Sequence, residues 1–246
     1  PSNIKYALPA TEKQFSGNLP SGSYITIPKD VIVGVHWENV KDNRIDLDFS
    51  MINVDSKYGW DGGYRSETRE VLFSGDLTDA QKPYGATELF YVKKQTEDAF
   101  IMSLNYYNFD EDIPVPFKIF IASEAVWNMR QNYVVNPANV LVNVDSKMIE
   151  HQKTLGLLVT TPDENRFYFS ETGIGDKITS SNSEVTEHSR KYMMAYFENP
   201  ITLNDLFVRA GATIYNDKKN ALKGIDIDLS PELLEKDSII KLLKTS

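Results

Sequence analysis

Ile45-Asp46-Leu47-Asp48-Phe49 alternates between apolar and acidic side chains. In a β-strand successive side chains project to opposite faces, so the apolar residues face one way and the two aspartates face the other. A core that buries the apolar side sets the register of such a strand. The pattern therefore predicts a strand that carries Asp46 and Asp48 side by side on its second face.

Short runs of β-branched and aromatic residues, separated by turn residues, occur on both sides of this stretch. Long helical crossovers are missing between them, which favours antiparallel strands in two packed sheets. We therefore expect a mainly β fold, an antiparallel β-sandwich with a C-terminal helical extension. The predicted strands are residues 31–35, 45–51, 87–92, 100–107, 117–122, 140–144, 154–160 and 166–169.

The pattern changes after Gly175, where apolar residues take helical spacing. Residues 183–187 can cap one helix, a second is expected over about 203–209, and Ser230-Pro231 can begin a third. Pro and Gly punctuate the N-terminal segment and break any regular period there. The expected domains are an arm or linker (1–23), a sandwich (24–178) and a helical extension packed on the sandwich (179–246).

Composition limits the partners. The formal net charge is −9 over 246 residues, which disfavours nucleic acid and anionic membranes and favours a cation. The sequence contains no cysteine, so disulfides, thiolate ligands and thiol catalysis are excluded, and the cytoplasm is the simplest location. No apolar run approaches the roughly 20 residues that span a bilayer, so membrane insertion is not expected.

Further acidic residues follow in the same third of the chain: Asp76 and Asp79 in a turn-like stretch, and Glu88 in the next predicted strand. Clustered carboxylates repel one another, whereas Ca²⁺ accepts about six to eight oxygen ligands, and Thr78 can add a neutral oxygen. Solvated strand ends, or an Asp48 that accepts backbone hydrogen bonds, are the alternative readings. We predict a site for one or two calcium ions formed by Asp46, Asp48, Asp76, Thr78, Asp79 and Glu88.

Several motifs occur in a fixed order between about residues 24 and 178. They are Val33-Gly34-Val35-His36-Trp37, Ile45-Asp46-Leu47-Asp48-Phe49-Ser50, Phe73-Ser74-Gly75-Asp76-Leu77, Ala86-Thr87-Glu88-Leu89-Phe90-Tyr91-Val92, and Arg166-Phe167-Tyr168-Phe169 with Gly173-Ile174-Gly175. Together they resemble the tellurium-resistance TerD family, with its Val-Gly-x-x-Trp strand, Thr-Gly-Asp-Asn turn, acidic segment and Gly-x-Gly ending.

The resemblance implies a calcium-binding β-sandwich in bacterial stress-response systems linked to tellurite, phage and toxin resistance. We also expect a protein partner in a stress-response complex. Asp46, Asp48, Asp76 and Glu88 match acidic positions of the family, while Asp79 lies in the variable loop between them. The family's Gly- and Asp-rich loop is replaced by residues 78–85, and Lys82 adds an opposing charge. Fewer carboxylates imply fewer ions or weaker binding.

Signals for catalysis are weak. The three histidines lack zinc-site spacing, no Gly-x-Ser-x-Gly elbow is present, and residues 173–177 lack the full phosphate-loop spacing. We expect a binding module and not an enzyme. A metal-free interaction or scaffold domain is the alternative, and a glycosidase that uses two carboxylates ranks last.

Overall fold

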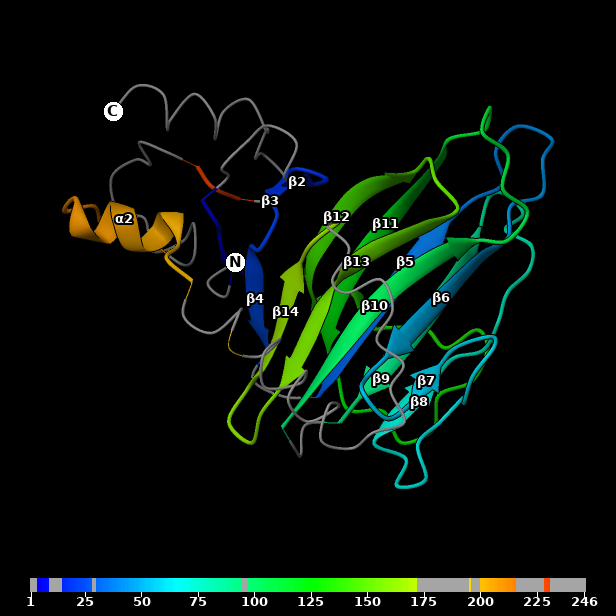
Figure 1. Ribbon diagram of the computed structural model, residues 1–246, viewed down its shortest axis with the longest axis horizontal. Coiled ribbons are helices and arrows are strands. Elements are labelled where there is room, and N and C mark those ends of the chain that lie inside the picture. Colours follow the sequence, from blue (N-terminus) through cyan, green and yellow to red (C-terminus); the bar gives the residue numbers. More distant parts are fainter. Residues whose placement is uncertain are drawn as a thin grey trace.

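The computed structural model describes residues 4–8, 15–27, 30–93, 97–171, 195, 200–215 and 228–230. Two antiparallel sheets pack face to face within them (Figure 1), which confirms the predicted mainly β sandwich. The strands are β1 (Ile4–Lys5), β2 (Phe15–Ser16), β3 (Leu19–Pro20), β4 (Tyr24–Ile27), β5 (Val31–Trp37), β6 (Leu47–Ile52), β7 (Lys57–Tyr58), β8 (Val71–Phe73), β9 (Ala86–Val92), β10 (Asp98–Tyr106), β11 (Val115–Ser123), β12 (Val140–Met148), β13 (Gln152–Thr160) and β14 (Asn165–Phe169).

The larger sheet has seven strands in the order β1-β4-β14-β13-β10-β6-β7, and the smaller has five in the order β12-β11-β5-β9-β8. Strands β2 and β3 form a separate two-stranded ribbon, and a short 3-10 helix, η1 (Pro137–Asn139), precedes β12. All eight predicted strands are present, most of them longer than expected at one or both ends. The very short β7 and β8 have too few residues to show a period, so the sequence pattern does not predict them.

The core between the sheets is built from alternate side chains of facing strands. Leu47, Phe49 and Met51 of β6 are fully buried, and the Phe49 ring lies 4.9 Å from the ring of Phe90 on β9. Burial of a large apolar side chain stabilises the fold by about 1.5–3 kcal/mol, so this alternation decides which face β6 turns inward. Asp48 is thereby placed on the opposite face, as predicted.

The N-terminal segment, expected to be an arm or linker, contributes short strands. β1 pairs with β4 through Ile4 and Ile25, and both side chains are buried in the core. Pro and Gly break the sequence period in this segment, but a strand of two residues can form without a recognisable period. The domain boundaries at residues 23 and 178 stay predictions.

The predicted helix over 203–209 is confirmed as α2 (Leu203–Arg209). A capping box begins it, because Thr202 accepts from the amide of Asp205 and Asp205 accepts from that of Thr202. The amide of Leu203 also donates to the carbonyl of Tyr6 at 2.7 Å, which joins α2 to the N-terminal segment. The helices expected after residues 183–187 and after Ser230 lie outside the described residues, apart from Ala195.

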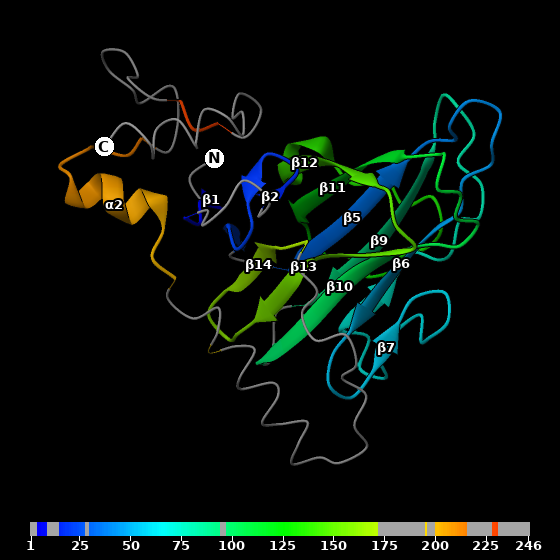
Figure 2. The same cartoon turned by 45° about the horizontal axis from the view of Figure 1, so that its top comes forward.

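Figure 1 and Figure 2 both place α2 on the opposite side of the molecule from β7. In the described part of the chain, no helix has the length and apolar character that a membrane crossing requires.

Candidate metal centre

The start of β6 carries two buried aspartates. Asp46 precedes the strand and is 6% exposed as a residue, while Asp48 is 3% exposed. The backbone of Asp46 is held on both sides, because its amide donates to Asn108 Oδ1 at 3.0 Å and its carbonyl accepts from the amide of Tyr107 at 3.0 Å. The strand period then brings both carboxylates to one face.

A third carboxylate comes from the other sheet. Asp76 lies in the turn after β8, next to Gly75, whose φ of 111° favours glycine. The side chain of Gln131 fixes this turn, since its Nε2 donates to the carbonyl of Asp76 at 2.9 Å. One oxygen each of Asp46, Asp48 and Asp76 lies within 4.8 Å of the others. We call these three residues the aspartate triad.

The triad contains buried oxygens that have no hydrogen-bond partner. Oδ1 of Asp46 and Oδ1 of Asp76 are both shielded from solvent and unpaired. Among the described residues, two groups approach the remaining oxygens: Nη2 of Arg44 lies 3.5 Å from Asp46 Oδ2, and Nδ2 of Asn105 donates to Asp48 Oδ2 at 3.2 Å. An unpaired buried acceptor costs about 1–3 kcal/mol, and a cation held between these two oxygens would remove that cost.

The electrostatics agree with this interpretation. Burial raises the pKa of Asp48 to about 6, with smaller contributions from the Asp46 and Asp76 charges. Burial also raises the pKa of Asp46 and of Asp76, and for Asp46 the neighbouring Asp76 adds to the effect. Carboxylates that are hard to ionise together are the groups that a bound dication stabilises in charged form.

Glu88, predicted as a ligand, has a different role. Its side chain is fully buried, and its two oxygens accept from the amides of Phe49 (2.9 Å) and Leu77 (2.8 Å). One carboxyl group thus links β9 to β6 and to the turn after β8. Burial, the largest cause, raises its pKa to about 9. Glu88 lies beside the triad but belongs to the framework that supports it.

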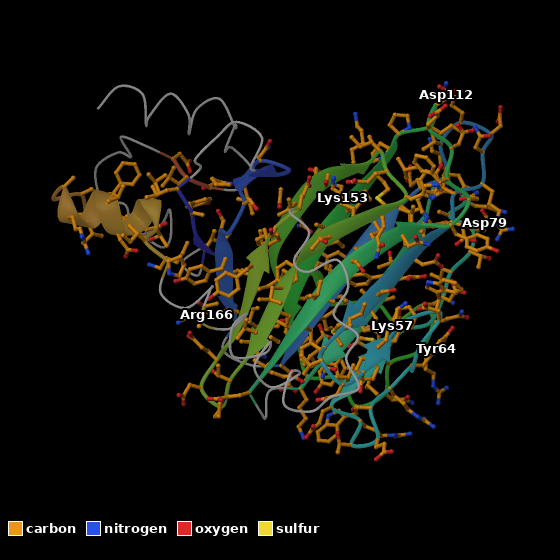
Figure 3. All side chains as sticks on the ribbon, viewed as in Figure 1. Lys57, Tyr64, Asp79, Asp112, Lys153 and Arg166 are labelled. Carbon is orange, nitrogen blue, oxygen red and sulfur yellow. The ribbon has the colours of Figure 1, made fainter. Side chains whose placement is uncertain are left out.

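Asp79 and the carbonyl of Thr78 have other hydrogen-bond partners. Asp79 is exposed and accepts from Asn39 Nδ2 and Gln81 Nε2, both at 2.8 Å, and these bonds lower its pKa. Figure 3 shows it on the outside of the loops at the right-hand edge. The carbonyl of Thr78 accepts from Nε of Arg44, so that oxygen already has a donor. The structure therefore brings together three of the six predicted ligands.

Sequence reasoning missed the cation that faces the triad and the amide opposite Asp48. Arg44 stands two residues before Asp46, and strand alternation through residues 44–48 would have placed it on the same face. Asn105 gave no such signal, because its contact follows from the pairing of β6 with β10, where Asp48 lies opposite Asn105.

The donor set suits a hard cation. All three triad residues offer carboxylate oxygen, which Ca²⁺ and Mg²⁺ prefer, and neither histidine nor thiolate is among them. The three carboxylates supply part of a calcium coordination sphere of about six to eight oxygens, and carbonyls and water commonly complete such spheres. The residues present therefore fit one ion better than two.

No family model matches the sequence, and no curated protein matches it. A solved structure titled "Crystal structure of unknown function protein SAV2460" is similar over 66% of this chain and 97% of that chain, with 16% sequence identity and a TM-score of 0.40. This similarity carries no functional argument. The resemblance to the TerD family stays a prediction.

Proposed function

We propose that the protein is a calcium-binding β-sandwich module in which a single Ca²⁺ is held by Asp46, Asp48 and Asp76. The observation that carries the proposal is the pair of buried, unpartnered oxygens, Oδ1 of Asp46 and Oδ1 of Asp76, inside one carboxylate triad. No hydrogen-bond donor of the described chain satisfies them, and a dication would.

The ion acts structurally. Asp48 belongs to the seven-stranded sheet and Asp46 lies just before the same strand, whereas Asp76 belongs to the turn that leaves the five-stranded sheet. A cation between them would join the two layers at this end of the sandwich and order the loop from residue 74 to 85 as a recognition surface. The resemblance to the TerD family supports a setting in a bacterial stress response of the tellurite, phage or toxin resistance type, with another protein as the partner.

Calorimetric titration of chelator-treated protein with CaCl₂, together with thermal melting, tests the proposal. The parent protein should bind about one ion per chain, and at a calcium concentration 100 times Kd the ion should add about 2.7 kcal/mol of stability. For a chain of this size that corresponds to a rise in Tm of about 5–10 °C.

Matched variants locate the site. Asp48→Asn and Asp76→Asn keep the shape of the side chain and remove a charge, so each should weaken binding at least tenfold. Asp79→Asn makes the same change on the exposed neighbour and should leave binding intact. No heat and no calcium-dependent shift in the parent protein would reject the proposal, and so would equal weakening by all three substitutions.

A metal-free interaction domain is the second candidate, and one observation favours it. Arg44 already faces Asp46 at 3.5 Å, and a raised pKa lets Asp48 stay protonated near pH 6, so the triad has a partial means of neutralisation without metal. A well-folded protein that gives no calcium heat, and that is retained on a specific protein partner in the presence of chelator, would support this candidate instead.

A further inference from the structure

A cavity lined by basic residues lies beside the aspartate triad. This cavity, of about 320 Å³, opens between the loop that precedes β8 and the loop that follows β11. Figure 3 shows Tyr64, one of its lining residues, beside β7 and β8. The residues that carry the argument are Tyr64, Arg65, Arg69, Trp127, Arg130 and Gln131, and we call this cavity the arginine pocket.

The charge of the arginine pocket contrasts with that of the whole chain. The sequence has seven arginines and a net charge of −9, yet three of the seven line this one cavity. The described residues that line it include no carboxylate, and neither Arg65 nor Arg69 belongs to a salt bridge of the described structure. Guanidinium groups gathered in this way repel one another and favour an anion, for which arginine supplies fixed, paired donors.

The backbone holds one of these arginines in an uncommon conformation. Arg69 has a φ of 59°, in the left-handed region that a side chain rarely occupies. The turn is secured by its amide, which donates to the carbonyl of Ser66 at 3.0 Å, and by Ser66 Oγ, which accepts from the amides of Glu70 and Val71. A strained, well-anchored residue at the rim of a cavity is a feature of ligand sites.

Two aromatic side chains add flat surfaces. Trp127 is 89% exposed and Tyr64 is 47% exposed, and both line the cavity. A solvent-exposed tryptophan does not contribute the favourable free energy that burial of its ring would give. Its large ring is also the best aromatic surface on which a planar group can stack. The volume lies at the lower end of the range for small-molecule sites, about 300–1,000 Å³, so a small ligand fits and a folded partner does not.

We infer that the arginine pocket binds a small phosphate-bearing molecule with a planar ring, of the mononucleotide class. The arginines bind the phosphate through charge-assisted hydrogen bonds, and the planar ring stacks on Trp127 and Tyr64. Gln131 lines the pocket and also donates to the carbonyl of Asp76, so the pocket borders the triad. Its binding chemistry uses no metal, and the inference stands without calcium.

Calorimetric titration with adenosine 5′-monophosphate, in the presence of a chelator, tests the inference and keeps it separate from the calcium proposal. Adenosine and inorganic phosphate serve as the two half-ligands. The nucleotide should bind saturably and at least tenfold more tightly than either half, and rising salt should weaken it because the contacts are ionic.

Single substitutions place the ligand in the pocket. Arg69→Gln and Arg130→Gln should each weaken nucleotide binding about tenfold, as expected for a lost charge-assisted contact, and Trp127→Ala should weaken adenosine and the nucleotide alike. Arg209→Gln, an exposed arginine on α2 at the far side of the molecule, is the matched control and should change nothing. Because these side chains are exposed, unchanged melting curves should show that each variant folds.

Three outcomes would overturn the inference. One is the absence of saturable nucleotide binding up to about 5 mM, which corresponds to a binding free energy weaker than roughly 3 kcal/mol. The second is nucleotide binding that no pocket substitution alters. The third is inorganic phosphate binding as tightly as the nucleotide, because the ring would then play no part.

Discussion

Glu88 offers a prediction that separates a structural carboxylate from a metal ligand. Glu88→Ala removes both acceptors of the buried side chain and leaves the amides of Phe49 and Leu77 without partners. Each unsatisfied buried amide costs about 1–3 kcal/mol, so the substitution should destabilise the protein by about 2–6 kcal/mol. That is a large fraction of the roughly 5–15 kcal/mol that stabilise a typical domain.

Glu88→Gln should cost less. The glutamine carbonyl can still accept from one of the two amides, and the side chain is neutral without a bound proton. Urea unfolding and thermal melting, measured with chelator present, should rank the parent protein first, the Gln variant second and the Ala variant last. At about 2–4 °C per kcal/mol, the Ala variant should melt roughly 4–24 °C below the parent.

Calcium titration of the Gln variant completes this test. Because both oxygens of Glu88 are engaged by backbone amides, the Gln variant should lose less calcium affinity than Asp48→Asn or Asp76→Asn. Two results would refute the reasoning: an Ala variant that melts within 2 °C of the parent, or a folded Gln variant that no longer binds calcium.

Three shorter predictions follow. Calcium affinity should fall about tenfold per pH unit below about pH 6, where the ion must displace the proton of Asp48. Without calcium, the stability that comes from the raised pKa of Asp48 is greatest below the ordinary pKa of 3.8 and is lost as pH rises through 6. Calcium titrations and matched melts from pH 4 to 8 measure both, and calcium affinity that does not change with pH would show that Asp48 is not a ligand. Arg44→Gln removes the positive charge that lies 3.5 Å from Asp46. The repulsion between this exposed charge and a bound ion is about 1 kcal/mol, so the variant should bind calcium about fivefold more tightly by calorimetry. Equal or weaker binding would contradict this. Gly34→Ala would place a Cβ 2.2 Å from the Phe120 ring, so overpacking should cost about 1–3 kcal/mol in urea unfolding, and an unchanged midpoint would show that the ring can move aside.

The sandwich was predictable because its strands show clear periods or β-rich runs. Alternation through residues 45–49 identified the buried face of β6 and put Asp46 and Asp48 together on the other. Very short elements such as β7 and β8 carry no period, so the sequence pattern did not predict the sheet edges that they form, although it did predict the edge strand β12. A two-residue strand depends on the neighbour it pairs with, and the neighbour is a property of the fold.

The candidate site was predictable in part. Acidity alone cannot separate Glu88 from Asp76, because whether a carboxylate meets backbone amides or other carboxylates depends on which strands face each other. Both faces of β9 are buried, so alternation gave no hint that Glu88 points inward between the sheets. The grouping of Trp127 with Arg65 and Arg69 depends likewise on two loops far apart in sequence that the sheets bring together.

The position of the triad follows from an incomplete sheet edge. β7 pairs with β6 at Met51 and Ile52, and no strand among the described residues pairs with the earlier part of β6 on that side. Glu88 supplies the acceptor that the amide of Phe49 would otherwise lack, and the turn with Asp76 comes close because the amide of Leu77 binds the same carboxyl group. A cation at the triad would therefore add a second link between β6 and the turn that contains Asp76, beside the link that Glu88 makes. Since the Phe49 and Phe90 rings pack independently of it, losing the ion should loosen the turn without dissolving the core.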